Sequence, residues 1–145
     1  MIALLQRVSR ASVSVDGEVV GQIGRGLLAL IAVHRDDEDK DIERLAERIL
    51  TYRLFPDSED RMNKSLQDVQ GGLLLVPQFT LAADTKKGTR ASFTRAAEPD
   101  KGAAFFERLV GICRDRIECV ETGRFGAKMQ VSLVNDGPVT FWLES

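Results

Sequence analysis

The sequence predicts a single α+β domain in which a curved, largely antiparallel, barrel-like β-sheet carries two main helices. Strand-like segments outnumber segments with helical spacing, and they come in runs that two isolated helical segments separate, which is typical of α+β folds. With 145 residues, of which 43% are hydrophobic, the chain is long enough for one core and too short for two ordinary domains. We therefore expect residues 1–145 to form one domain.

The first third of the chain predicts strands, and a helix follows them. Residues 2–5 are strand-like, and valines alternate with other residues around the Asp-Gly pair at 16–17, which predicts a β-hairpin with a tight turn. The continuous apolar run at 27–33 predicts a strand that is covered on both faces. Acidic residues at 36–41 then begin a helix, which Pro56 ends.

The second half of the chain returns to strands around one more helix. Residues 73–76 predict a strand that resumes around 79–82. Pro99 opens a second helix with an apolar stripe on one side. At the C-terminus, residues 128–143 predict two strands joined by a turn at 135–138.

Composition and charge exclude several classes of protein. A net charge of −2 argues against a large basic face that coats nucleic acid, although a protein that grips only the end of an RNA is compatible with it. No apolar run approaches the roughly 20 residues of a membrane span. The N-terminus lacks the pattern of a secretory signal, so we expect a cytoplasmic protein that contacts no membrane. Cys113 and Cys119 fit no zinc or redox spacing, and we expect free thiols.

The residue inventory leaves little for side-chain catalysis. His34 is the single histidine, it lies between a predicted strand and an acidic helix start, and no Ser or Cys motif adjoins it. A catalytic triad, a metal site and a phosphate-binding loop are all without their motifs, so we expect neither a metal nor a cofactor. An enzyme of this composition would use backbone dipoles, a hydroxyl, or chemistry that its substrate supplies.

Two polar clusters stand where strands are predicted to end. The first is Pro-Gln-Phe-Thr-Leu-Ala at 77–82, and the second is Asn-Asp-Gly-Pro-Val-Thr at 135–140. They resemble the signatures Ser-Gln-Phe-Thr-Leu and Asn-x-Gly-Pro-x-Thr of the D-aminoacyl-tRNA deacylases. Further matches at 5–13, 88–93 and 122–125 extend the resemblance over essentially the whole chain. Pro77 stands where the family usually has Ser, and a proline has no N–H to donate.

The resemblance implies an RNA-assisted editing hydrolase that works as a homodimer. It would cleave the ester of D-aminoacyl-tRNA at the 3′ acceptor end, and that of mischarged glycyl-tRNA, with the ribose 2′-hydroxyl helping to activate water. Gln78, Phe79 and Thr80 would be the catalytic residues, and the amides of Phe79 and Thr80 would stabilise the oxyanion. The Gly137–Pro138 bond would be cis and would enter the site of the other subunit, where it excludes L side chains.

The resemblance also implies supporting contacts. Arg7 and Thr140 would support the pocket, and Phe125 and Met129 would contact the terminal adenine, although ordinary packing explains this last pair equally well. The remaining contacts with the tRNA end would come from the basic residues Lys86, Lys87 and Arg90. Without the resemblance, a solvated loop is the better interpretation of those three.

Two other functions stay open at this point. One is a non-catalytic module that binds an RNA end or a small ligand on the same fold, and Pro77 is the residue that favours it. The other is a hydrolase on the same scaffold with a different acyl substrate.

Overall fold

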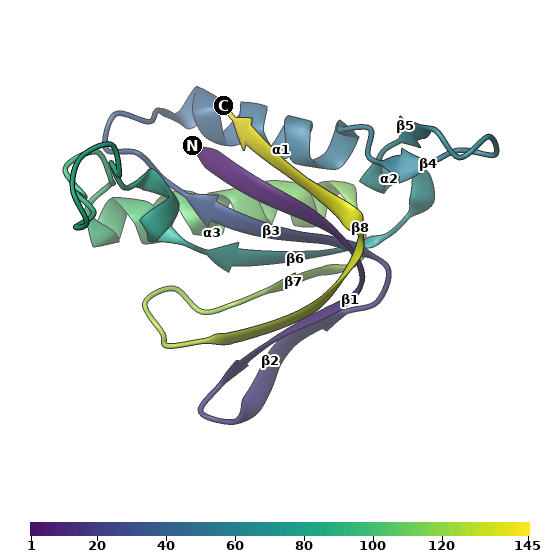
Figure 1. The fold of residues 1–145 in the computed structure, drawn as a ribbon, viewed down its shortest axis with the longest axis horizontal. Helices are drawn as coiled ribbons and strands as arrows, with labels where there is room; N and C mark the ends of the chain where they lie inside the picture. Colours follow the sequence, from purple (N-terminus) through teal and green to yellow (C-terminus); the bar gives the residue numbers. More distant parts are fainter.

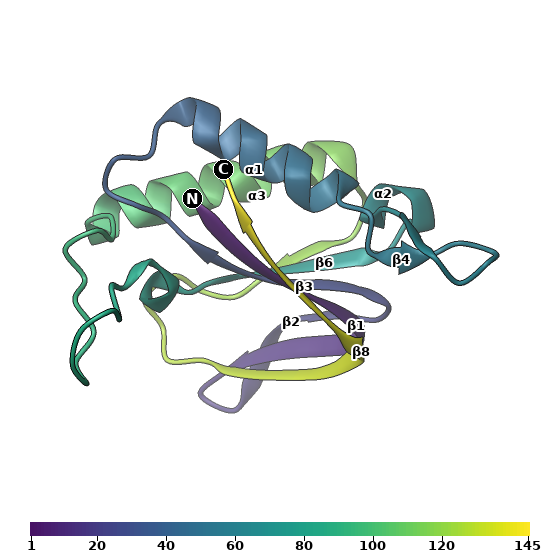
Figure 2. The same ribbon diagram turned by 45° about the horizontal axis from the view of Figure 1, so that its top comes forward.

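The fold is organised around strand β1 (Ile2–Val15), which pairs antiparallel with three other strands. They are β2 (Glu18–Ile23), β3 (Gly26–Ala32) and β8 (Gln130–Glu144). The computed structural model describes all residues from 1 to 145. In it the sheet curves strongly, as Figures 1 and 2 show, and the predicted α+β class with a barrel-like sheet is confirmed.

The sheet continues from β3 through two parallel pairs. Strand β6 (Gly72–Pro77) pairs parallel with β3, and β7 (Val120–Thr122) pairs parallel with β6. Each of these connections contains a long helix, which returns the chain to the same end of the sheet. Three of the five strand pairings in this sheet are antiparallel, in agreement with the predicted largely antiparallel sheet.

The two main helices, α1 (Asp39–Thr51) and α3 (Pro99–Arg116), lie together on one side of the sheet (Figure 2). Helix α1 begins with a capping box between Glu38 and Asp41. The Glu38 amide donates to the Asp41 carboxylate, which lowers the pKa of that carboxyl group. Three small elements follow α1, namely β4 (Phe55–Pro56), β5 (Met62–Lys64) and α2 (Leu66–Val69).

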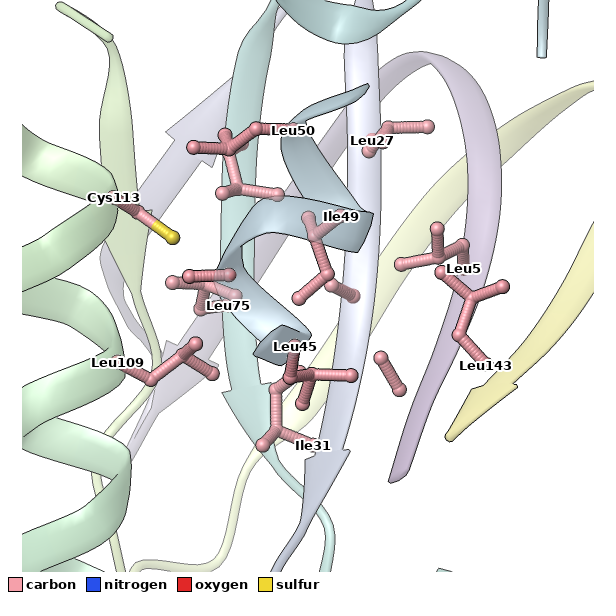
Figure 3. Close-up of a cluster of buried hydrophobic side chains, with 14 of the residues drawn as sticks. Leu5, Leu27, Ile31, Leu45, Ile49, Leu50, Leu75, Leu109, Cys113 and Leu143 are labelled. Atoms are coloured by element: carbon pink, nitrogen blue, oxygen red, sulfur yellow. The ribbon is translucent and has the colours of Figure 1, made fainter. Parts of the chain in front are cut away.

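Buried side chains fill both sides of the central strands. A cluster of 23 residues joins the helices to the sheet, and Figure 3 shows Leu45 and Ile49 of α1 in front of the strands and Leu109 of α3 beside them. A smaller cluster of seven residues lies on the other side, within the curve of the sheet. Along β6, Leu75 belongs to the first cluster and Leu74 to the second, so this strand is covered on both faces.

Residues 79–82 do not continue the strand, and that prediction is wrong. They form a 3-10 helix, η1 (Phe79–Ala82). Neighbouring β3 ends at Ala32, so no strand is available to pair with the chain beyond Pro77. The chain turns at Gln78 instead, after its amide has donated to the carbonyl oxygen of Ile31 at 2.7 Å.

The turn predicted at 135–138 does not separate two C-terminal strands. Residues 130–144 form the single strand β8, and both of its halves pair with β1. Thr140 lies opposite Gln6 and Asn135 lies opposite Val8, so four residues of β8 lie between these pairs where β1 has only Arg7. The surplus residues make a bulge at 136–138, which projects from the sheet.

None of the helices combines the length and the hydropathy that a membrane-spanning helix requires. No group of three or more His, Cys, Asp or Glu side chains comes together in a way that could hold a metal ion.

Candidate active site

Two adjacent backbone amides are left without an acceptor where η1 begins. The amide of Leu81 donates to the Gln78 carbonyl at 3.2 Å, which is the first bond of the 3-10 turn. The amides of Phe79 and Thr80 precede this bond, and no group of the chain accepts from either of them. Free N–H groups side by side are the donors that stabilise an oxyanion when water attacks an ester.

A cavity of about 460 Å³ lies beside these amides, within the usual size of a ligand site. The end of β6 and the start of η1 form one side of it, and the segment between β7 and β8 forms another. It is lined by Val76, Pro77, Gln78, Phe79, Ala97, Pro99, Phe125, Gly126, Ala127, Met129 and Val131. The structure thus brings together Gln78, Phe79, Phe125 and Met129, all of which the sequence nominates.

No ionisable side chain lines this cavity. Burial raises the pKa of the Cys113 thiol to about 12 in the core between α3 and the sheet, where it cannot serve as a thiolate at neutral pH. The cavity therefore offers backbone dipoles and apolar surface, and it offers no general base. A second cavity, of about 520 Å³ and lined by β1, β2 and β8, contains none of the nominated residues.

The Thr80 hydroxyl is exposed and accepts a hydrogen bond from the Gln78 side-chain amide at 2.5 Å. It does not line the cavity, whereas Gln78 does. The side chain of Gln78 therefore links the cavity to the first turn of η1.

Two glycines, which sequence reasoning missed, make room for Phe125 and Met129. A Cβ at Gly123 would lie 2.7 Å from the sulfur of Met129, and this sulfur also accepts from the Arg124 amide at 3.4 Å. A Cβ at Gly102 would lie 3.2 Å from the ring of Phe125. The Thr-Gly-Arg-Phe sequence at 122–125 carries the signal for the first of these glycines.

Pro77 stands where the hydrogen bonding between β6 and β7 ends. On β6, the amide of Leu73 donates to Cys119 and the carbonyl of Leu75 accepts from Gly123, so alternate residues face β7. Pro77 belongs to that series but lies beyond the end of β7 at Thr122. A proline at the end of the ladder is therefore tolerated.

The second motif lies away from the cavity in the same chain. Gly137 and Pro138 sit at the tip of the β8 bulge, the bond between them is cis as the resemblance implies, and neither residue lines the cavity. Thr140 lies at the base of the bulge, and its hydroxyl accepts a hydrogen bond of 3.4 Å from the side-chain amide of Gln6.

Arg7 holds this bulge against the segment that follows α1. Its Nε donates to the Asp136 carbonyl at 2.8 Å and lies 3.4 Å from the Asp136 carboxylate, while a terminal nitrogen donates to the Leu54 carbonyl at 2.8 Å. Within one chain Arg7 contacts the bulge and not the cavity, so its support of a pocket stays a prediction about a pair of chains.

Asn135 is a further structural determinant of the bulge that sequence reasoning did not single out. Its side-chain amide donates to the carbonyl oxygens of Arg7 and Val139, and its oxygen accepts from the Val139 amide. The position of Asn135 at the start of the Asn-Asp-Gly-Pro sequence could have indicated this role.

The basic residues Lys86, Lys87 and Arg90 lie on the exposed loop between η1 and α3, and none of them forms an ion pair. They do not line the cavity. They share their loop with Phe93, which contacts Phe79 at the cavity's edge.

Comparison with known proteins assigns nearly the whole chain to one family. The family model described as D-Tyr-tRNA(Tyr) deacylase matches residues 4–144. The chain belongs to the D-aminoacyl-tRNA deacylase family. A D-aminoacyl-tRNA deacylase of Alkalilimnicola ehrlichii is 64% identical to it over 145 residues, covering 100% of this chain and 97% of the relative. Another, of Thioalkalivibrio sulfidiphilus, is 67% identical over 144 residues, which is 99% of this chain and 97% of that one.

Solved structures agree with the fold of this deacylase family member. A protein described as the c-Myc DNA unwinding element binding protein superposes with a TM-score of 0.96 at 38% identity. The superposition covers 100% of this chain and 99% of that one.

Proposed function

We propose that this protein hydrolyses the ester bond of D-aminoacyl-tRNA and releases the free D-amino acid and tRNA. The observation that carries the proposal is the pair of unpaired amides at Phe79 and Thr80 beside an uncharged cavity. Membership of the D-aminoacyl-tRNA deacylase family supports the choice of substrate.

Hydrolysis would proceed by direct attack of water on the ester carbonyl. The developing oxyanion accepts hydrogen bonds from the amides of Phe79 and Thr80, and each such donor contributes about 2.7–4 kcal/mol to transition-state stabilisation. The family resemblance implies that the ribose 2′-hydroxyl of the substrate helps to activate the water, and a cavity that no ionisable side chain lines is compatible with this role. The reaction in this proposal forms no acyl-enzyme.

Chiral selection would need a second copy of the chain. The Gly137–Pro138 bulge does not line the cavity of its own chain and projects from the sheet, which supports the proposal that it enters the cavity of the other chain in a homodimer. Bonds from Arg7 and Asn135 hold the bulge in one position. A rigid backbone beside the substrate α-carbon collides with an L side chain, and it accepts a D side chain or the hydrogen of glycine.

The RNA end would occupy the remaining surfaces. The side chains of Phe125 and Met129 contact the terminal adenine in the cavity, where both glycines leave them space. The unpaired cations of Lys86, Lys87 and Arg90 approach the phosphates of the acceptor end.

The experiment that tests this function compares D-tyrosyl-tRNA, L-tyrosyl-tRNA and glycyl-tRNA as substrates and follows release of the amino acid. We expect hydrolysis of the D and glycyl substrates and none of the L substrate. Ala127→Trp fills the cavity and should abolish activity, whereas Ala104→Trp on the exposed side of α3 should not. Equal rates on D and L substrates, or an active Ala127→Trp variant, would overturn the proposal.

A second candidate, a nucleic-acid binding module, is favoured by one comparison. The solved structure with a TM-score of 0.96 carries the name of a DNA unwinding element binding protein. A non-catalytic module would bind uncharged tRNA or single-stranded DNA, and its presence would leave the half-life of D-tyrosyl-tRNA unchanged.

A further inference from the structure

Phe79 and Phe93 form a pair of exposed aromatic rings at the edge of the cavity. Their ring centroids are 5.2 Å apart, and the ring planes meet at 47°. Phe79 is 57% exposed and Phe93 is 43% exposed, although phenylalanine is among the residues that proteins most often bury. The pair therefore presents an apolar surface to the outside of the chain.

Phe79 places this pair next to the candidate active site. It lines the cavity that also contains Phe125 and Met129, and its amide is one of the two unpaired donors. A polymer whose last unit occupies the cavity and leaves on this side would therefore pass over Phe79 first and Phe93 next.

Phe93 stands on a hydrogen-bonded base. Asp84 and Ser92 exchange backbone hydrogen bonds of 2.8 and 3.0 Å just before it, and the Ala96 amide donates to the Phe93 carbonyl at 3.1 Å just after it. One bond further on, the Arg35 amide donates to the carbonyl of Arg95 at 3.0 Å. These bonds fix the position of the ring beside Phe79.

The loop that the Asp84–Ser92 pair closes carries unpaired positive charge. Lys86, Lys87 and Arg90 are exposed on it, and Asp84 is its one acid. The Asp84 carboxylate accepts from the Lys86 amide at 3.0 Å, which holds the backbone at the start of the cationic stretch. Figure 2 shows this loop projecting beside the N-terminal end of α3.

Exposed aromatic rings next to unpaired cations are the elements with which proteins bind single-stranded nucleic acid. The rings stack on bases, and the cations attract the phosphates between them. We propose that Phe79 and Phe93 form a stacking surface for the base of the nucleotide that precedes the aminoacylated terminal adenosine. This inference rests on the proposed function, since it takes the adenosine to lie in the cavity.

The rim of cations favours RNA over a second copy of this chain as the occupant. A stable protein interface buries about 800 Å² on each partner and depletes charge at its core. Two exposed rings, one of them on the same loop as two lysines and an arginine, match a polyanion better than the core of a protein interface.

The test compares two D-tyrosyl substrates, one on tRNA and one on adenosine alone, which lacks the preceding nucleotide. Phe93→Leu keeps an apolar side chain and removes the ring, and Phe93→Tyr keeps the ring. We expect Phe93→Leu to raise KM for D-tyrosyl-tRNA about fivefold or more, with kcat unchanged, because one stacking contact is lost. The KM for D-tyrosyl-adenosine should stay as in the wild type, and Phe93→Tyr should behave as the wild type on both substrates.

Three results would overturn the inference. Equal losses on both substrates would mean that Phe93 acts only by holding Phe79. Unchanged KM on both would mean that no base stacks there. A change in oligomeric state of Phe93→Leu, measured by light scattering, would assign the surface to a second copy.

A binding measurement separates this inference from the proposed function. The probe is an RNA trinucleotide with the 3′ sequence of tRNA, followed by fluorescence anisotropy. Weaker binding to Phe93→Leu than to the wild type would support the stacking surface even if the wild type hydrolysed no aminoacyl ester. Equal binding to both, with hydrolysis intact, would overturn the stacking surface and leave the proposed function standing.

Discussion

Asn135 and Val139 hold each other across the β8 bulge through a reciprocal pair of hydrogen bonds. The Asn135 amide nitrogen donates to the Val139 carbonyl at 3.0 Å, and the Val139 amide donates to the Asn135 oxygen at 3.2 Å. The same Asn135 nitrogen donates to the Arg7 carbonyl on β1 at 2.8 Å. One side chain thus closes the loop around residues 136–138 and ties it to the neighbouring strand.

Asn135→Ala should destabilise the protein and disturb the bulge. The substitution removes all three bonds and leaves half-buried backbone groups without partners, which costs about 1–3 kcal/mol. The measurements are the free energy of unfolding in urea and the rate of hydrolysis of D-tyrosyl-tRNA, and both values should fall. The control is Gln130→Ala, an exposed residue of the same strand whose side chain makes no hydrogen bond within the chain. An Asn135→Ala variant as stable and active as that control would contradict the assigned role.

The parts of the fold that local pattern determines were predictable from the sequence. The hairpin at Asp16-Gly17, the strand at 27–33 and both main helices depend on periodicity and on turn or capping residues that lie close together in the chain. The bent strand β8 could not be predicted this way. Its Asn-Asp-Gly-Pro sequence is equally typical of a hairpin, and only the pairing of both halves with β1 distinguishes the two.

In the candidate site too, some residues could be predicted from the sequence and others could not. The motif residues Gln78 and Phe79 could be nominated from the resemblance, and so could Phe125 and Met129, which the fold brings to the same cavity. Gly102 could not be nominated, because its role depends on the ring of Phe125, which lies distant in sequence. The end of β6 at Pro77 likewise depends on where β3 and β7 end.

Gly137→Ala should lower the ratio of D to L hydrolysis. A Cβ at this position would lie 2.0 Å from the Val139 amide nitrogen, so the backbone of the bulge must move. A displaced bulge no longer collides with an L side chain, and hydrolysis of L-tyrosyl-tRNA should appear. Gly111→Ala is the control, since a Cβ there meets no atom within 4 Å. An unchanged ratio in a folded Gly137→Ala variant would mean that another element reads chirality.

Mixing subunits should reveal that the bulge acts on the other chain. Ala127→Trp chains have a filled cavity and a normal bulge. Gly137→Ala chains have an open cavity and a displaced bulge. After random exchange in equal amounts, L-tyrosyl-tRNA hydrolysis should fall by about half, because half of the open cavities then face a normal bulge in a symmetric dimer. Mixing without exchange is the control. If each bulge served its own cavity, exchange would leave the L rate unchanged.

The two cysteines should differ sharply in reactivity. Cys119 is exposed, whereas Cys113 is buried and its pKa is raised from the ordinary 9.0 to about 12 by burial. At pH 8 a thiol reagent should therefore modify one thiol per native chain quickly and the second only on unfolding.

The Cys113 thiol ionises near pH 9 in the unfolded chain and near pH 12 in the folded chain. The stability that Cys113 contributes is therefore complete below pH 9 and is lost as the pH rises to about 12. Cys119→Ser should abolish the fast reaction, and a fast reaction in that variant would contradict the burial of Cys113.

Thr80→Ala should reduce kcat only modestly, because the Thr80 hydroxyl accepts a bond from Gln78 but does not line the cavity. Loss of one such bond costs about 1 kcal/mol, or about fivefold in rate. Loss of a covalent nucleophile would instead reduce kcat by a factor of about a thousand or more. Thr51→Ala serves as the control, because it removes another exposed hydroxyl, which donates a hydrogen bond to the Glu47 carbonyl on α1.

Mass spectrometry of the wild type during turnover should detect no acyl group on Thr80, while a substrate with hydrogen in place of the 2′-hydroxyl should be hydrolysed far more slowly. A trapped acyl-enzyme at Thr80, or full activity on the 2′-deoxy substrate, would contradict hydrolysis by backbone amides with help from the RNA.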